Sequence, residues 1–149
     1  MEKHTEQELI RRDSLQKLKE LGINPYPADE YKTTSTSIDL KRGFSETTTQ
    51  RVVVAGRIMS RRIMGKASFI EIKDFKGRVQ VYVNRDEICQ TDDKTMYNEV
   101  FKKYLDIGDI IGIDGEVFKT KVGEISIRAK KIKILSKSIK PLPVVKKCL

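Results

Sequence analysis

One aromatic residue in this sequence, Phe69, is predicted to lie on the exposed face of a strand, where it does not contribute to the core. Residues 66–83 (KASFIEIKDFKGRVQVYV) alternate apolar and polar side chains with a period of two, which is typical of strands with one buried and one exposed face. In that register Ile70 and Ile72 face the interior, so Phe69 falls on the exposed face. A phenyl ring there is suited to stacking on a base of a single-stranded nucleic acid, unless another part of the protein covers it.

Two basic segments are expected to flank Phe69. Residues 60–66 (SRRIMGK) precede its strand, and residues 119–123 (KTKVG) form a tight loop later in the chain. A basic groove that carries aromatic side chains is the usual surface for single-stranded nucleic acid. We therefore expect Phe69 and Tyr82 to supply aromatic faces, and we expect five basic side chains to contact phosphates: Arg61, Arg62, Lys66, Lys119 and Lys121.

Two polar side chains indicate hydrogen bonding to a base. Gln80 is expected opposite Phe69 on the exposed face of the next strand, and its amide offers both a donor and an acceptor. Glu124 is unusual in a groove that binds phosphates, because its negatively charged carboxylate repels the phosphate backbone of the nucleic acid. It is explained if it accepts a hydrogen bond from a base edge, which indicates recognition of a base and not of the backbone alone.

Structural explanations for the same residues stay open at this point. Residues 5–21 are predicted to form an amphipathic helix with Leu15, Leu18 and Leu21 along one face, and that face could cover Phe69. Tyr82 could serve cross-strand packing, and the two polar residues could be ordinary surface side chains.

The order of predicted elements indicates the fold class. After the helix, the Ser- and Thr-rich residues 28–50 are expected to form an extended surface connector. A bend or bulge is expected at Gly56, residues 60–65 are expected to link two strands, and a helix is expected at 96–104, with Met96, Val100, Phe101 and Tyr104 at helical spacing. The predicted strands are 51–59, 66–73, 78–84, 109–118 and 124–135.

Three strands, a helix and two further strands make the order of the OB-fold, a five-stranded Greek-key barrel. The predicted fold is therefore mainly β with a minor helical part, and the helix between the third and fourth strands closes one end of the barrel. The predicted domains are an N-terminal helix with its connector (1–50), the OB-fold (51–137) and a linker (138–149).

The charge distribution favours a polyanionic partner. The formal net charge is +9, and the whole excess lies in residues 51–149, which hold 22 basic and 12 acidic side chains. Such a block can be a merely solvated surface. Concentrated on one small domain, it is more typical of nucleic-acid binding than of membrane binding.

Motifs for catalysis are missing from the sequence. Gly65-Lys66 resembles part of a P-loop, but Ser60 and Ala67 stand where that motif needs a glycine and a serine or threonine. The distant Cys89 and Cys148 and the single His4 predict neither a zinc site nor a disulfide framework, so we expect no catalytic residue, metal or cofactor in this chain. Without a long apolar run or a signal peptide, a cytoplasmic protein is expected.

Long ordered strings of residues resemble one known family. AGRIMSRRIMGKASFIEIKD, GRVQVYVNRD, YNEVFKKYLDIGDIIGIDGEVFKTKVGEISI and KPLP closely resemble the anticodon-binding domain of class II lysyl-tRNA synthetases, and RRDSLQKLKELGINPYP is similar to the segment before it. The resemblance implies an OB-fold that binds the anticodon loop of lysine tRNA in protein biosynthesis. It also implies that Phe69 stacks on an anticodon base and that Arg61, Gln80 and Glu124 contact anticodon bases.

The same resemblance sets expectations for the rest of the protein. Family members continue after the PLP segment into a catalytic domain that binds ATP, Mg and lysine, and nothing in this sequence matches its motifs. Aminoacylation is therefore expected of a larger parent enzyme. The resemblance implies that this parent is a homodimer. Two alternatives remain: a general single-strand-binding module, and a scaffold for subunit contacts of the parent through the leucines of residues 15–21.

Overall fold

The computed structural model describes residues 5–27 and 31–139. Its helical segments are α1 (Glu6–Glu20), α2 (Ser37–Arg42), α3 (Arg85–Ile88) and the π-helix η1 (Met96–Tyr104). Its strands are β1 (Arg51–Met64), β2 (Ala67–Lys73), β3 (Arg78–Asn84), β4 (Ile110–Lys119) and β5 (Ile125–Ser136).

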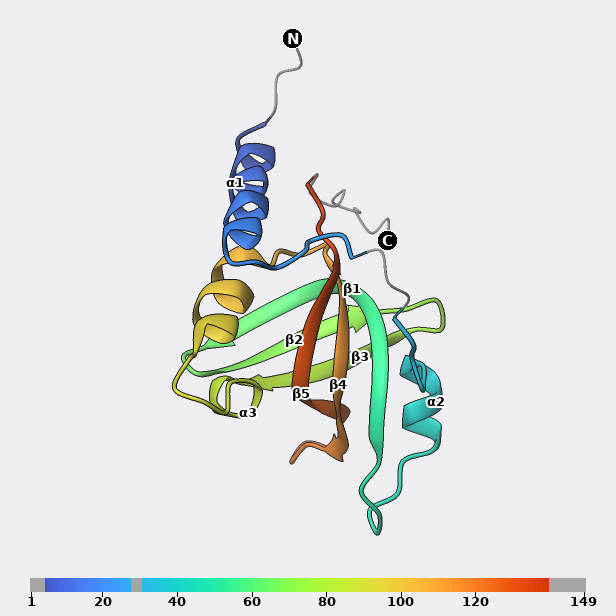
Figure 1. The fold of residues 1–149 in the computed structure, drawn as a ribbon. Coiled ribbons are helices and arrows are strands. Elements are labelled where there is room, and N and C mark those ends of the chain that lie inside the picture. Colours follow the sequence, from blue (N-terminus) through green and yellow to red (C-terminus); the bar gives the residue numbers. More distant parts are fainter. Residues whose placement is uncertain (1–4, 28–30, 140–149) are drawn as a thin grey trace.

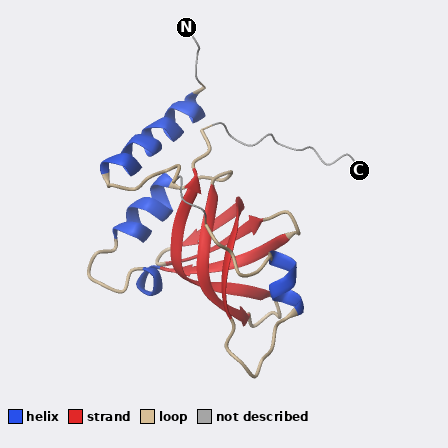
Figure 2. Ribbon diagram, turned by 45° about the vertical axis from the view of Figure 1, so that its right-hand side comes forward, coloured by secondary structure: helices blue, strands red, loops and turns tan. Residues whose placement is uncertain are grey.

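The five strands form a closed barrel in the order β1-β2-β3-β5-β4 (Figure 1). β3 and β5 pair in parallel, and the other neighbours are antiparallel. The strands cross one another around the barrel, and the helices lie outside them (Figure 2). The predicted OB-fold is confirmed. The predicted domain limits stay a prediction, and His4, Cys148 and most of the predicted linker lie outside the described residues.

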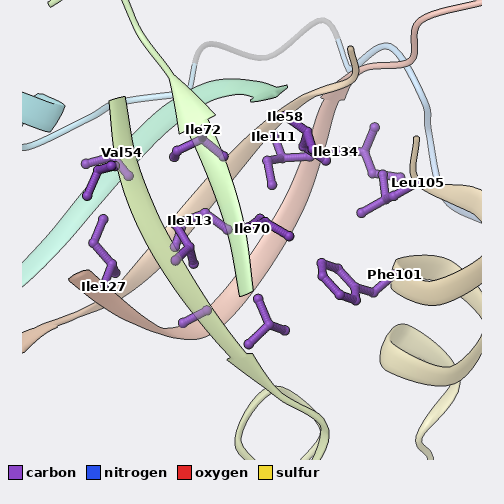
Figure 3. Close-up of a cluster of buried hydrophobic side chains, with 14 of the residues drawn as sticks. Val54, Ile58, Ile70, Ile72, Phe101, Leu105, Ile111, Ile113, Ile127 and Ile134 are labelled. Atoms are coloured by element: carbon purple, nitrogen blue, oxygen red, sulfur yellow. The ribbon is translucent and has the colours of Figure 1, made fainter. Parts of the chain in front are cut away.

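Apolar side chains fill the barrel from every strand (Figure 3). β2 and β3 bury every second residue, as their alternation predicts. Phe101 points from η1 toward this cluster and is fully buried (Figure 3), so the helical segment between β3 and β4 closes one end of the barrel, as expected.

The helical segment at 96–104 has the predicted bounds but a different geometry. It is a π-helix that buries Tyr97 in addition to the predicted Val100 and Phe101, while the predicted Met96 and Tyr104 are only partly buried against the core. A π-helix bonds residue i to i+5 and turns more widely, which shifts the set of residues on one face. The rings of Tyr97 and Phe101 stack with centroids 5.5 Å apart.

α1 begins as predicted but buries a different face. The Thr5 hydroxyl accepts a hydrogen bond from the Glu8 amide and caps the helix. The buried positions are Arg11, Ser14 and Leu18. The predicted stripe is correct for Leu18, which is fully buried, and wrong for Leu21, which lies beyond the last turn and is 45% exposed. α1 packs beside η1 (Figure 1).

The expected extended connector at 28–50 is wrong, because it contains α2. Thr36 caps α2, and the Asp74 carboxylate accepts hydrogen bonds from the Ser37 amide and hydroxyl, both at 2.7 Å. Burial raises the pKa of the Asp74 carboxyl, but hydrogen bonds from Ser37, Lys76 and Gly77 lower it by more, so that this pKa lies below its ordinary 3.8. These bonds hold the β2–β3 turn against α2.

β1 is longer than predicted and bulges elsewhere. It runs to Met64, so that residues 60–64, expected in a linking loop, pair with β2. The register shift falls between Ile58 and Ser60, where Met59 is the extra residue, and not at Gly56. Gly56 instead permits close approach, since a Cβ there would lie 3.0 Å from the Lys73 carbonyl oxygen. The short α3 was not predicted.

Candidate nucleic-acid interface

Phe69 lies on the outer face of the barrel, as the alternation predicted. It pairs with Arg62 on β1 and with Tyr82 on β3, between the buried Ser68 and Ile70. Its partly buried ring lies against Tyr82, with centroids 5.3 Å apart and planes at 57°. No residue of α1 lines either cavity beside the ring, so the N-terminal helix does not cover it.

Tyr82 joins Phe69 to an aromatic cluster that the sequence did not reveal. Phe118 meets Tyr82 edge to face at 6.2 Å. The Arg128 guanidinium lies 5.5 Å from the Tyr82 ring and 5.1 Å from the Phe118 ring. The proposed cross-strand packing of Tyr82 is therefore present, and the packing also creates a partly exposed aromatic surface with a cation above it.

A cavity of about 260 Å³ lies on one side of Phe69 and gathers the residues predicted to contact bases. Its polar lining comes from three separate parts of the chain: β1, the paired strands β2 and β3, and the β4–β5 loop. This size admits one nucleobase beside the phenyl ring. The residues that line it are Ser60, Arg61, Arg62, Phe69, Ile70, Glu71, Gln80 and Glu124.

Gln80 reaches this cavity from a position different from the one expected. It pairs with Glu71 and not with Phe69, which lies diagonally two residues away. The buried Ser126 hydroxyl donates to the Gln80 Oε1 at 2.9 Å. That bond fixes the amide, and the Gln80 Nε2 is then the group that can donate to a base acceptor.

Arg61 and Arg62 extend to opposite sides of β1. Arg61 pairs with the buried Ile70, and its Nη1 donates to the carbonyl oxygens of Phe101, at 3.1 Å, and Leu105 at the end of η1. Arg62 pairs with Phe69 on the outer face. Arg61 is also one of the residues that line the cavity, so the same residue borders the cavity and holds the end of η1.

A second cavity, of about 450 Å³, lies on the other side of Phe69. The β4–β5 loop closes it: Gly123, with φ at 91°, donates its amide to the Thr120 carbonyl, and the Glu124 amide donates to the Thr120 hydroxyl. Its residues are Phe69, Tyr82, Phe118, Lys119, Thr120, Lys121, Val122 and Arg128.

The structure brings only some of the basic residues predicted to contact phosphates close to Phe69. Lys119 and Lys121 line the second cavity, and Arg62 lines the first. Lys119 also lies 3.6 Å from the Glu46 carboxylate. Lys66 is exposed in the β1–β2 turn and lines neither cavity, so it can meet RNA only beyond the aromatic surface.

The described residues contain no group of three or more histidine, cysteine or acidic side chains that could hold a metal ion. Within the same part of the chain, no helix has the length and apolar character needed to cross a membrane.

Comparison with known proteins places the chain in a family. Residues 52–135 match the tRNA_anti-codon family, described as an OB-fold nucleic acid binding domain. The chain is 55% identical over 146 residues to a lysine–tRNA ligase of Christiangramia forsetii, covering 98% of this chain and 25% of that protein. It is 53% identical over 145 residues to the lysine–tRNA ligase of Porphyromonas gingivalis, covering 95% and 25%.

A more distant relative shows the same pattern of coverage. The lysine–tRNA ligase of Thermoanaerobacter sp. strain X514 is 48% identical over 134 residues, which are 90% of this chain and 26% of that protein. The chain thus spans about a quarter of the length of the curated relatives it matches.

Proposed function

The chain belongs to the tRNA_anti-codon family of OB-fold nucleic acid binding domains, and from this premise we propose that it binds the anticodon loop of lysine tRNA. In this proposal it is the tRNA-recognition part of a lysine–tRNA ligase. Relatives that match nearly the whole of this chain are named lysine–tRNA ligases. The residues that perform the recognition are those around Phe69.

The observation that carries the proposal is the cavity beside Phe69. Lysine anticodons centre on uridine, and uracil presents a donor at N3 and acceptors at O2 and O4. Phe69 supplies a face for stacking, and the Glu124 carboxylate accepts from the donor. The Gln80 Nε2 and the Arg61 guanidinium donate to the acceptors. The cavity therefore holds the complementary groups for one uracil.

Positive charge around the two cavities supplies affinity. Lys119, Lys121 and Arg128 line the second cavity, and Arg62 flanks Phe69. Together with Lys66 in the nearby turn, these cations contact the phosphates on either side of the stacked base. Such contacts strengthen binding without selecting a base.

Catalysis belongs to the part of the ligase outside this chain. The proposal assigns ATP, Mg and lysine to the catalytic domain of the parent enzyme, and it assigns no aminoacylation to this chain alone. The proposal likewise assigns homodimer formation to that parent.

A single pair of RNA hairpins tests the proposal. Binding is measured at fixed salt to a lysine-type anticodon stem-loop and to the same hairpin with its middle uridine changed to cytidine. Cytosine keeps the aromatic face but replaces the N3 donor with an acceptor, so the proposal expects weaker binding of the changed hairpin. Equal affinity would identify a general single-strand-binding module, and no binding to either hairpin would refute RNA recognition.

The α1 helix gives one specific reason to keep the scaffold alternative. Leu9 and Ile10 are 55% and 51% exposed on this helix. Concentration-dependent association in light scattering, abolished by Leu9→Ser with Ile10→Ser, would support subunit contact as a further role.

A further inference from the structure

A second cationic surface lies on the same sheet as Phe69, at the other end of the β2–β3 hairpin. Arg57 pairs with Lys73, and Lys73 pairs with Arg78, so three exposed basic residues form one row across β1, β2 and β3. Like charges directly opposite one another on a sheet are destabilising. A row of three is therefore expected where an anionic partner neutralises it.

The neighbouring groups leave Lys73 available. Arg78 forms an ion pair with Glu71 at 2.8 Å, and Arg57 donates to the Gly108 carbonyl at 3.2 Å. The Lys73 ammonium group has no hydrogen-bond or ion-pair partner among the described residues. The row thus has two anchored cations at its ends and an unpaired one between them.

The turn that follows this row presents an aromatic ring to solvent. Phe75 is 87% exposed, with the Lys76 ammonium 6.0 Å from its ring centroid. The Asp74 carboxylate accepts from the amides of Lys76, at 2.9 Å, and Gly77, at 3.0 Å, while also accepting from Ser37. The exposed ring is therefore held by a fixed turn, and binding a partner costs little ordering.

The row and the Phe69 cavity are aligned on one face. Phe69, Glu71 and Lys73 alternate along the outer side of β2, so Lys73 in the row lies four positions along the strand from the stacking ring. At the rise of an extended strand this is about 13 Å. An RNA chain seated at Phe69 can therefore follow the hairpin and place phosphates on the row.

From this alignment we propose that Lys73 and Lys76, with Arg57 and Arg78, bind the phosphate backbone of the same RNA beyond its anticodon bases, and that Phe75 stacks on a base at the end of this track. The inference rests on the proposed function. It extends the RNA contact from one cavity to the full length of the β2–β3 hairpin.

Salt dependence of binding measures this contact directly. The double variant Lys73→Ala with Lys76→Ala is compared with Lys131→Ala with Lys133→Ala, which removes the same charge from exposed positions on β5. Each phosphate contact contributes about 0.7 to the slope of log K against log salt for a single strand. Loss of two contacts should shrink the slope by about 1.4, which is about a 25-fold loss of affinity at 0.1 M salt relative to 1 M.

The outcomes separate this inference from the function on which it rests. The β5 double should keep the wild-type slope, and Phe75→Ala should bind about 5-fold more weakly or worse. If Phe69→Ala weakens binding while the Lys73 and Lys76 double keeps the wild-type slope, the inference is wrong and the proposed function stands. Equal changes in both doubles also overturn it, because they reflect net charge alone. If the wild-type chain binds no hairpin, both are wrong.

Discussion

Arg61 and Arg62 are adjacent residues of one type that extend to opposite sides of β1, so Arg61→Ala should reduce both stability and RNA binding, whereas Arg62→Ala should reduce RNA binding alone. The Arg61 Nη1 donates to the carbonyls of Phe101 and Leu105 at the end of η1. Arg62 is exposed beside Phe69. The first substitution removes contacts within the fold together with a proposed base contact, and the second removes only charge from the proposed RNA surface.

The structure sets the expected magnitudes. Hydrogen bonds from a charged donor are worth about 1.5–3 kcal/mol, and the two carbonyls lose their donor when Arg61 is replaced. For a chain of this size that loss lowers the Tm by about 3–12 °C. Arg62→Ala removes no hydrogen bond within the described residues, so its stability should stay within about 0.5 kcal/mol of wild type.

Two measurements on the same three proteins check this reasoning. Urea denaturation gives the free energy of unfolding, and titration with the lysine-type hairpin gives the Kd and its salt dependence. Arg62→Ala should reduce the magnitude of the salt slope by about 0.7, since one phosphate contact is lost. If Arg61→Ala proves as stable as Arg62→Ala, the assigned role of Arg61 at the end of η1 is refuted.

Four further substitutions address the site and the fold. Phe69→Ala should weaken hairpin binding by about 1–3 kcal/mol through lost stacking, and an unchanged Kd would contradict the role of this ring. Glu124→Gln should narrow the difference between the uridine and cytidine hairpins more than it changes overall affinity; equal losses on both would argue against base recognition. Lys137→Met should lower the free energy of unfolding, measured by urea denaturation, by about 3–5 kcal/mol, because it removes the cation that lies 3.0 Å from the buried Asp109 carboxylate. A decrease below about 1 kcal/mol would show that the buried carboxylate does not depend on the Lys137 cation. Asp74→Asn should be less stable than wild type above pH 3.8, the ordinary pKa, and this difference should vanish as the pH falls through the lower folded-state pKa of Asp74; urea titrations from about pH 7 to about pH 2 that show a constant difference would contradict the assigned hydrogen bonds.

The strands and the pairing of β2 with β3 could be predicted because their signal is local. Alternation places Val79, Val81 and Val83 on one side and fixes the face of Phe69. The turn at 74–77 then brings the two strands together. In a sheet with one buried face, the alternation of apolar and polar residues determines the register, because a slip of one residue would expose the whole apolar side.

The bulge in β1 had no such signal, and it changed the assignment of two arginines. Strict alternation from Ile58 would place Arg61 on the outer face. The extra residue Met59 shifts the phase, so that Arg61 meets η1 and Arg62 joins Phe69. The preceding glycine suggested a bulge at Gly56, but that glycine serves close contact with β2.

Phe118 and Arg128 were missed because their place depends on contacts between distant segments. Tyr82 meets Arg128 only through the parallel pairing of β3 with β5, across more than forty residues of sequence. The short α2 was missed for a related reason: part of its N-terminal capping comes from Asp74, on another element. A helix of six residues is marginal without such support.

The bulge also links the formation of the site to the formation of the fold. Arg61 lines the cavity beside Phe69 and at the same time bonds the end of η1, which places Phe101 in the core. The cavity wall on this side is therefore held by the helical segment that closes the barrel. An RNA ligand that engages Arg61 stabilises the same contact, so binding of the hairpin should protect η1 more than it protects α1.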